Sequence, residues 1–240
     1  SESHHNSSST KKNALKPWRV KRWCIPPSHN AAFVLGMEDV LDVYHRPYDL
    51  SRPVVCFDET NKQLLRHTRV PVPARRGQPR RVDDEYKRCG TANIFAAFEP
   101  LTGRTLIEAI ASRDFIHTAH FLRRLSDELF PDASQIVLVM DNVSSHGFGC
   151  FYEAFEPAEA RRLTQRFEVH NTPTHGSWLN VAEILLSVMS RQCLDQRIDT
   201  MESLQAAVDA WLESRSGVTV NWQFTTADAR IKLRRLYPST

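Results

Sequence analysis

The 240-residue sequence predicts an α/β fold in which a mixed β-sheet carries helices on its faces. In the first half, β-type runs separated by turns indicate strands joined as hairpins, whereas strands alternate with helices in the second half. After Gln135, the run Ile136 to Met140 is wholly apolar, which is typical of a strand buried on both faces. A sheet with both hairpin and crossover connections is mixed, so we expect parallel and antiparallel pairs together.

Individual elements follow from periodicity and from helix-breaking and turn-forming residues. Apolar residues recur at helical spacing from Ala31 to Tyr44, and Pro131 stops a second helical pattern that begins at Asp114. Strands are expected at 54–58, 90–98, 105–110, 135–140 and 167–171, with 63–67 returning as the second arm of a short hairpin. Helices are expected at 31–44, 114–129, 157–167, 177–196 and 201–214. The Pro- and Arg-rich segment 71–81 cannot lie in the centre of a sheet.

Composition favours a soluble globular protein: 41% of the residues are apolar and 25% are charged. No apolar stretch approaches the length that spans a membrane, and the N-terminus has no secretory leader pattern. Five widely separated cysteines without a C-x-x-C pair argue against a disulfide framework or a zinc site and favour reduced thiols. We expect residues 1–10 to be disordered, 11–50 to form a basic arm and linker helix, and 51–240 to form one domain.

Basic residues are clustered, although the formal net charge is only +3. Residues 1–23 carry six Lys and Arg against a single acid, and residues 66–81 carry six Arg and no acid. Such runs neutralise phosphates in nucleic-acid-binding proteins, although a solvated charged surface is the alternative interpretation. The candidate DNA contacts are Lys21, Arg22, Arg66, Arg69, Arg75, Arg76, Arg80 and Arg81.

Three carboxylates stand at positions that suit a metal site. Asp58 closes the apolar run from Val54, Asp141 closes the run from Ile136, and Glu183 lies in the first turns of a predicted helix. Mg²⁺ prefers a few carboxylate oxygens and leaves positions for substrate phosphate, and two such ions support in-line phosphoryl transfer. Taken singly, an Asp after a strand is more often a turn former or helix cap, and Glu183 has the alternative of an ordinary surface glutamate.

The sequence around Glu183 leads to two local expectations. Ser177 or Thr174 is placed to cap the helix, and the apolar neighbours of Glu183 predict that its carboxylate is partly buried. His146 and His175 are expected to contact phosphate or orient the acids, with ordinary loop histidines as the alternative. Ser144-Ser145-His146 does not form a hydrolase motif, and no glycine-rich phosphate loop is present.

With these residues assembled, the chain resembles the DDE transposases of the IS630 family, within the IS630/Tc1/mariner superfamily. The resemblance extends over roughly Lys11 to Pro238, and the order of four blocks makes it specific. These blocks are Val54–Glu59, Gly90–Phe95, Ile136–Asn142 and His175–Glu183.

The resemblance implies an RNase H-like fold with a mixed five-stranded sheet. Asp58, Asp141 and Glu183 would then be the catalytic acids and would hold Mg²⁺ or Mn²⁺, as two ions. The expected supporting residues are Asn142, His146, His175, Trp178 and Asn180. The implied activity is cleavage at transposon ends and strand transfer into target DNA at TA dinucleotides, by a dimer on double-stranded DNA in the cytoplasm of a prokaryote, associated with the nucleoid.

Three features depart from the family pattern. The 41 residues between Asp141 and Glu183 exceed the usual mariner spacing, and the helix at 157–167 accounts for the extra length. Thr174 stands where many relatives have Lys. Only 57 residues precede Asp58, without a pair of amphipathic helices, so a helix-turn-helix is expected on a separate subunit or reading-frame product. The alternatives are an inert remnant that binds DNA or a transposase, and another RNase H-like nuclease.

Overall fold

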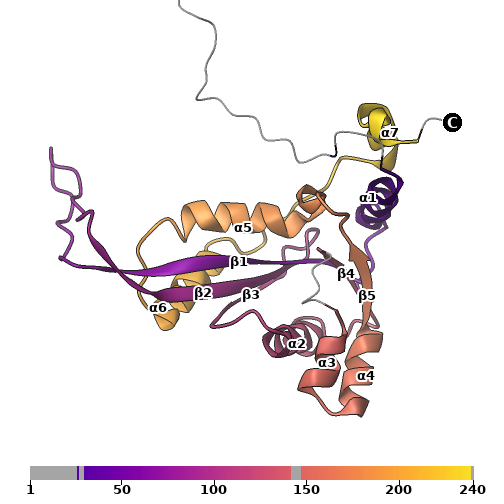
Figure 1. Cartoon of the computed structure of the whole chain (residues 1–240), viewed down its shortest axis with the longest axis horizontal. Helices are drawn as coiled ribbons and strands as arrows, with labels where there is room; N and C mark the ends of the chain where they lie inside the picture. The colour runs from indigo at the N-terminus through magenta and orange to yellow at the C-terminus, as the bar shows by residue number, and fades with distance from the viewer. Residues whose placement is uncertain (1–25, 27–29, 142–146, 239–240) are drawn as a thin grey trace, which may run out of the picture.

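The computed structural model describes residues 26, 30–141 and 147–238, which form one sheet with helices on both faces (Figure 1). The strands are β1 (Val54–His67), β2 (Tyr86–Phe98), β3 (Thr105–Ile110), β4 (Ile136–Met140) and β5 (Phe167–Asn171). The α-helices are α1 (Ala31–Tyr44), α2 (Phe115–Arg124), α3 (Gly149–Ala154), α4 (Pro157–Arg166), α5 (Val181–Gln192), α6 (Met201–Glu213) and α7 (Thr226–Lys232). Short turns are η1 (Leu125–Leu129), a π-helical turn, and η3 (Ser177–Leu179) and η4 (Arg234–Leu236), which are 3₁₀-helical.

The sheet has five strands in the order β3-β2-β1-β4-β5. β1 and β3 both run antiparallel to β2, whereas β4 runs parallel to β1 and to β5. The predicted mixed five-stranded sheet with flanking helices is therefore confirmed. Consecutive hairpins produce the antiparallel half, and helical crossovers produce the parallel half.

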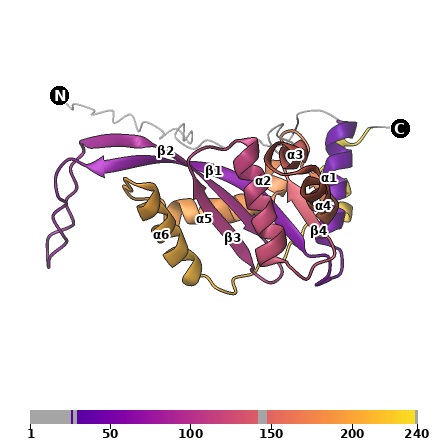
Figure 2. The same ribbon diagram turned by 90° about the horizontal axis from the view of Figure 1, so that it is seen from below.

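The first hairpin differs from the expectation. Residues 54–67 form one continuous strand rather than two, with an irregularity between Gln63 and Leu65, and β1 pairs along its length with β2. The chain reverses only in the segment 68–85, because its prolines cannot donate to a strand ladder. Figures 1 and 2 show this long β1–β2 ribbon extending beyond the helices.

Alternate residues of the central strands enter two separate cores. Cys56 and Val139 belong to a core shared with α1, α5 and α6, whereas Val55, Phe57 and Leu138 belong to a core shared with α2, α3 and α4. All five residues of β4 are buried, as predicted for a strand covered on both faces. Helices therefore cover both faces of β1 and β4, which are inner strands of the sheet.

Several helix boundaries differ from the sequence-based assignment. The expected helix 114–129 changes to a π-helical turn after Arg124, and the expected helix 177–196 is divided at Asn180 into η3 and α5. Helices α3 and α7 were not anticipated, because each is at most seven residues long. Such short elements carry too few turns for a clear periodic signal.

Helix α1 packs into the same core as β1 and α5 through Phe33, Met37 and Leu41. The proposed boundary near residue 51 stays a prediction. The expected disorder of residues 1–10 and the basic arm with Lys21 and Arg22 lie outside the described residues. Within the described part of the chain, no helix combines the length and apolarity that crossing a bilayer requires.

Candidate active site on β1, β4 and α5

Asp58 lies on the central strand β1 and is only 8% exposed. Its Oδ1 accepts a hydrogen bond from the Glu59 amide at 2.8 Å, and its Oδ2 lies 3.4 Å from the Asn180 side-chain nitrogen. Burial, together with the charges of Glu183 and Asp141, raises the pKa of Asp58 to about 7, whereas the hydrogen bond from the Glu59 amide lowers it. A carboxylate in this condition is costly to ionise unless a cation compensates it.

Asp141 directly follows the buried strand β4 and is half-buried. Cys56 of β1 pairs with Val139 of β4 in parallel register. Asp58 lies two residues after Cys56, and Asp141 lies two residues after Val139. The register therefore brings Asp58 and Asp141 side by side on neighbouring strands. The charge of Asp141 raises the pKa of both other acids, which shows that the three carboxylates interact electrostatically.

Glu183 lies in the first turn of α5; the residue is exposed, and its carboxylate is partly desolvated, as expected from its apolar neighbours. Its apolar neighbours Ala182 and Leu185 are buried on the inner side of the helix, whereas Glu183 and Ile184 face outward. Partial desolvation raises the pKa of Glu183, and the charge of Asp141 raises it further. The positive end of the helix dipole at this turn favours the ionised form.

Asn180 joins the two elements that carry Asp58 and Glu183. Its side-chain oxygen accepts a hydrogen bond from the Ala182 amide at 3.1 Å, which makes Asn180 the N-cap of α5 in place of Ser177 or Thr174. Its side-chain nitrogen donates to the Phe57 carbonyl at 2.8 Å. Asn180 is fully buried, so these bonds fix the start of α5 against β1.

Tyr44 fixes the same junction from α1. Its hydroxyl donates to the Leu179 carbonyl at 2.7 Å, lies 3.3 Å from the Cys56 sulfur and accepts from the Val181 amide at 3.3 Å. Burial raises the pKa of Tyr44 well above its ordinary value, so the hydroxyl stays protonated. Sequence reasoning missed this role, because Tyr44 is one position of an apolar helical repeat and its partner Leu179 lies 135 residues away.

The loop before α5 is tightly packed. His175 has a φ of 66°, and the following Gly176 lies so close to Pro173 that an added Cβ would be 2.7 Å from the proline Cγ. His175 is exposed, and nothing in the described contacts ties it to the three acids. Trp178 packs edge-on against Phe224 with 6.2 Å between ring centroids. The other two expected supporting residues, Asn142 and His146, lie outside the described residues.

The three acids match a hard divalent cation in chemistry, because carboxylate oxygens are the ligands that Mg²⁺ and Mn²⁺ prefer. Among the described residues, no three His, Cys, Asp or Glu side chains are close enough together to enclose a metal ion. The arrangement is therefore a set of mutually repelling carboxylates beside the point where β4 ends against β1. A cation between them would relieve this repulsion.

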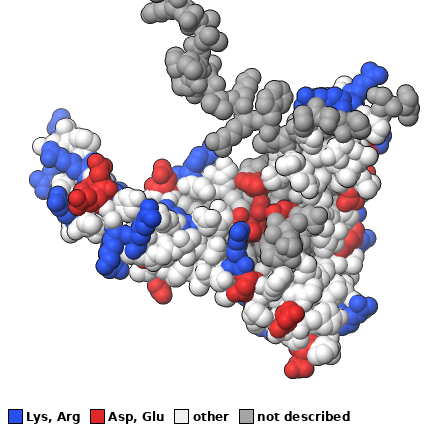
Figure 3. All heavy atoms as spheres, in the orientation of Figure 1, with Lys and Arg blue, Asp and Glu red and all other residues white. Residues whose placement is uncertain are grey.

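The predicted basic residues fall into two groups. Arg66 pairs with Asp199 at 2.9 Å, and Arg69 pairs with Asp83 at 3.3 Å. The other four arginines lie exposed in the segment between β1 and β2, and none of them forms an ion pair with a described acid: Arg75, Arg76, Arg80 and Arg81. Figure 3 shows Lys and Arg side chains gathered at the far end of the long ribbon.

Comparison with known proteins places the chain in a family. The profile of the DDE superfamily endonucleases matches residues 53–205, which include all three acids. No curated protein sequence matches the chain.

Solved structures of Mos1 transposase complexes share the fold. The mariner Mos1 paired-end complex with Mg has a TM-score of 0.57 at 18% identity and covers 92% of this chain and 67% of its own. The Mos1 strand transfer complex has a TM-score of 0.56 at 20% identity, covering 85% and 60%. The Mos1 mariner paired-end complex with Mn has a TM-score of 0.54 at 19% identity, covering 83% and 60%.

This chain thus spans about 60% of the length of the first matched structures. At these identities the similarity establishes the fold, and the strand order β3-β2-β1-β4-β5 is that of the expected RNase H-like domain. The profile match covers more than half of the sequence, and it includes the three carboxylates: Asp58 inside β1, Asp141 directly after β4 and Glu183 at the start of α5. By sequence and by fold, the chain belongs to the DDE superfamily endonucleases.

Proposed function

We propose that this chain is the catalytic domain of a DNA transposase, which cleaves DNA at transposon ends and transfers the strand into target DNA. The observation that carries the proposal is the placement of Asp58 on β1, Asp141 directly after β4 and Glu183 on α5 of a DDE endonuclease fold, where the charges of Glu183 and Asp141 raise the pKa of Asp58. Structural neighbours with the same fold are Mos1 complexes named for paired transposon ends and for strand transfer.

Asp58, Asp141 and Glu183 are the residues that would hold divalent cations, and two of the neighbouring structures are named for Mn and Mg. Two bound ions would supply an activated water or 3′-hydroxyl and compensate negative charge on the leaving oxygen. The protein contributes the rigidity of the ligands: β1 and β4 are buried from both faces, and Asn180 and Tyr44 fix the start of α5. A preorganised arrangement of this kind avoids reorganisation during the reaction.

The exposed arginines of the β1–β2 ribbon are proposed to contact the DNA backbone. Arg75 and Arg76 lie at its end without acidic partners among the described residues, so binding phosphate breaks no ion pair there. Arg66 and Arg69 must first exchange Asp199 and Asp83 for phosphate, so they add less. Backbone contacts provide affinity and orientation but little sequence information.

We further propose that the domain acts as a dimer on double-stranded DNA. A helix-turn-helix on a separate subunit or reading-frame product would recognise the transposon ends. The division into residues 11–50 and 51–240, and a cytoplasmic, nucleoid-associated location in a prokaryote, belong to this same proposal. Joining two ends requires two active sites, which supports the dimer.

The test of activity uses a supercoiled plasmid and a labelled duplex with a free 3′-hydroxyl, with Mg²⁺ or Mn²⁺. We expect metal-dependent nicking and joining of the labelled end to the plasmid by the wild type. Asp58→Asn, Asp141→Asn and Glu183→Gln should each abolish both products and retain DNA binding. Glu202→Gln is the matched control, because Glu202 also lies in the first turn of a helix, α6, away from the three acids.

Each other outcome selects an alternative. Nicking without joining would identify an RNase H-like nuclease that does not transfer strands. DNA binding without either product would support an inert remnant, and nicking or joining without a divalent metal would contradict the proposed chemistry.

The role of the ribbon is tested by the salt dependence of DNA binding. Replacing Arg75 and Arg76 together by Ala should weaken binding and reduce the slope of log K against log[salt] by up to about 2. Arg161→Ala is the control, because Arg161 is also exposed but lies on helix α4 and not on the β1–β2 ribbon. An unchanged slope in the double variant would show that the ribbon does not touch DNA.

A further inference from the structure

The connection between α5 and α6 crosses the base of the β1–β2 ribbon, where the ribbon leaves the body of the molecule (Figure 1). We call residues 194–199 of this connection the strap. The pairing of β1 with β4 stops at Cys56, far from the ribbon. Nearer the ribbon, the Leu65 amide donates a hydrogen bond to the Ile198 carbonyl of the strap at 2.7 Å. The strap thus takes up a backbone donor of β1.

Two side chains of β1 also hold the strap. The Lys62 ammonium donates to the carbonyls of Leu194 and Gln196, to the second at 2.8 Å. Arg66 forms an ion pair with Asp199 at 2.9 Å. Together with the backbone bond, these contacts join the strap to β1 at three positions.

Arg197 is the residue of the strap that reaches both arms of the ribbon. Its guanidinium donates to the Glu85 carbonyl at 2.9 Å and to the Asp84 carbonyl at 3.2 Å. It also lies 3.2 Å from Nδ1 of His67 and 5.5 Å from the ring centroid of Tyr86. His67 ends β1 and Tyr86 begins β2, so one planar group closes the base of the ribbon.

The guanidinium of Arg197 is directed at the protein. Its contacts with the two carbonyls and the imidazole occupy three of its five N–H donors. Arg197 is half-buried, whereas Arg75 and Arg76 farther along the ribbon are exposed. Binding phosphate would require Arg197 to break these bonds. Removing Arg197 should therefore free the ribbon without removing a phosphate contact.

Helix α5 is tied to β1 at both of its ends. At the start, Asn180 donates to the Phe57 carbonyl, and at the other end the strap follows shortly after Gln192. Glu183 lies in the first turn of this helix, and Asp58 lies on the strand that continues into the ribbon. The base of the ribbon, α5 and two of the three acids therefore belong to one bonded frame.

We propose that Arg197 is a positioning residue, which latches the ribbon to the strap and so holds the exposed arginines of the ribbon in a fixed place relative to the three acids. The inference rests on the proposed contact between the ribbon and DNA, and it identifies what directs that contact. A ribbon that is already ordered loses less freedom when it meets the phosphate backbone, so the latch increases affinity without touching DNA.

The first measurement uses no DNA. Residual dipolar couplings of the backbone amides report whether the ribbon and the sheet keep one relative orientation. In the wild type, residues 68–85 should fit the alignment tensor of the sheet, and in Arg197→Ala they should not. Arg197→Lys should behave like Arg197→Ala, because a lysine keeps the charge but lacks the planar fork that reaches two carbonyls. This second variant also serves if the alanine variant does not fold.

The second measurement is the affinity for a DNA duplex at several salt concentrations. Both Arg197 variants should bind about tenfold more weakly, with the wild-type slope of log K against log[salt], since no phosphate contact is lost. In a protein that already carries Arg75→Ala and Arg76→Ala, Arg197→Ala should have almost no further effect, because the aligned groups are gone. A purely structural role of Arg197 would not produce this dependence.

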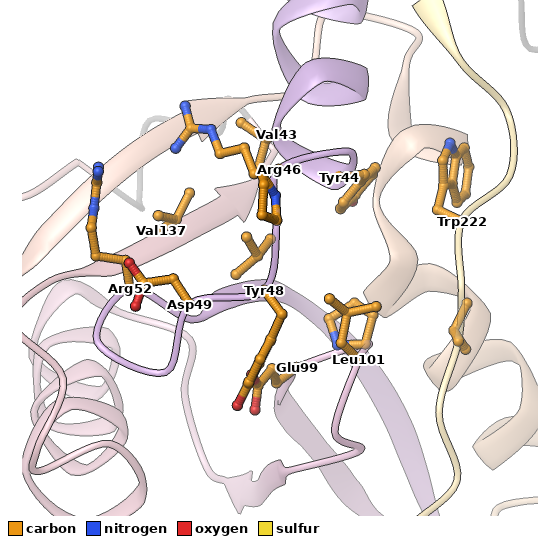
Figure 4. Close-up of a pocket in the computed structure, with 14 residues that line it drawn as sticks. Val43, Tyr44, Arg46, Tyr48, Asp49, Arg52, Glu99, Leu101, Val137 and Trp222 are labelled. Carbon is orange, nitrogen blue, oxygen red and sulfur yellow. The ribbon is translucent and has the colours of Figure 1, made fainter.

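Arg104→Ala is the matched control. Arg104 also donates to a backbone carbonyl, that of Leu129, and its guanidinium lies 4.4 Å from the ring centroid of Phe130. It follows the turn after β2, at the opposite end of that strand from the ribbon, where Glu99 and Leu101 line a cavity (Figure 4). We expect wild-type ribbon couplings and wild-type DNA affinity for this variant.

Three results would overturn the proposal. These are unchanged ribbon couplings in both Arg197 variants, unchanged DNA affinity, and a salt slope reduced by about one in Arg197→Ala, which would identify a direct phosphate contact. Each of them requires a wild type that binds DNA or a ribbon that is measured without it. A wild type that binds no DNA would instead refute the proposed function, and this inference with it.

Discussion

Replacing Asp58 by Asn should stabilise the metal-free protein, because ionised Asp58 opposes folding. Its pKa rises from an ordinary 3.8 to about 7 in the folded state. This shift of roughly three units corresponds to about 4 kcal/mol, since one unit is about 1.4 kcal/mol. The variant also loses the weak contact with Asn180, which offsets about 1 kcal/mol. We therefore expect a net gain of about 3 kcal/mol at pH 8.

The stability gained by Asp58→Asn should be larger at high pH than at low pH. Because the folded-state pKa of Asp58 is raised, the folded protein binds more protons than the unfolded chain between about pH 4 and pH 7. Wild-type stability is thus fully present below the ordinary pKa and declines as the pH rises through the folded value. At pH 5 the protonated carboxyl avoids most of the cost, so the advantage of Asp58→Asn should fall below about 1 kcal/mol.

Urea denaturation followed by circular dichroism in EDTA measures this difference at pH 8 and at pH 5. At pH 8, the midpoint of Asp58→Asn should be higher by about 1–2 M urea. Asp127→Asn is the control of opposite sign, because the pKa of Asp127 is lowered by its hydrogen bond with Arg162 and removing the charge should destabilise the protein. Mg²⁺ should then stabilise the wild type more than Asp58→Asn. A variant that is less stable than the wild type at pH 8 would refute the reasoning.

Two further substitutions test the support of the site. Asn180→Ala removes both the cap of α5 and the bond to β1, so it should cost about 1–3 kcal/mol in urea denaturation and reduce cleavage strongly. Thr200→Ala, which removes the cap of α6, should lower stability by a similar amount and leave cleavage intact; equal activities in the two variants would contradict the role of Asn180. Gly176→Ala should lower the melting temperature, because its Cβ would meet Pro173, whereas Gly149→Ala, with no atom within 4 Å, should not; unchanged melting of Gly176→Ala would show that the loop can relax.

Local pattern was sufficient for much of the fold. The apolar run at 136–140 predicted the buried strand β4, and the spacing from Ala31 to Tyr44 predicted α1 at its observed bounds. The long hairpin was misread, because the polar residues at 59–63 resemble a turn when the pairing strand is unknown. Pairing with β2 satisfies the backbone of that stretch, and this partner lies beyond any local window.

The candidate site, too, could be predicted from the sequence only in part. Asp58 and Asp141 could be selected because each closes an apolar run, and Glu183 because a family-like block surrounds it. The exposure of Glu183 could not be predicted, because the face of α5 that is buried depends on how Asn180 begins the helix. Asn180 was expected only as a supporting residue, and its contact with the Phe57 carbonyl bridges about 120 residues.

By itself, the sequence determined the classes of element, the two acids that follow apolar runs and the basic segment between β1 and β2; that Asp58 lies inside a longer strand was not predicted. These properties depend on residue types at short spacing, which hydrophobic periodicity and turn chemistry report directly. Only the tertiary structure decided which charges interact, which arginines are already paired and how Asn180 joins the start of α5 to β1. Those properties depend on burial and on distances between remote segments, and both arise only when the two faces of the sheet are covered.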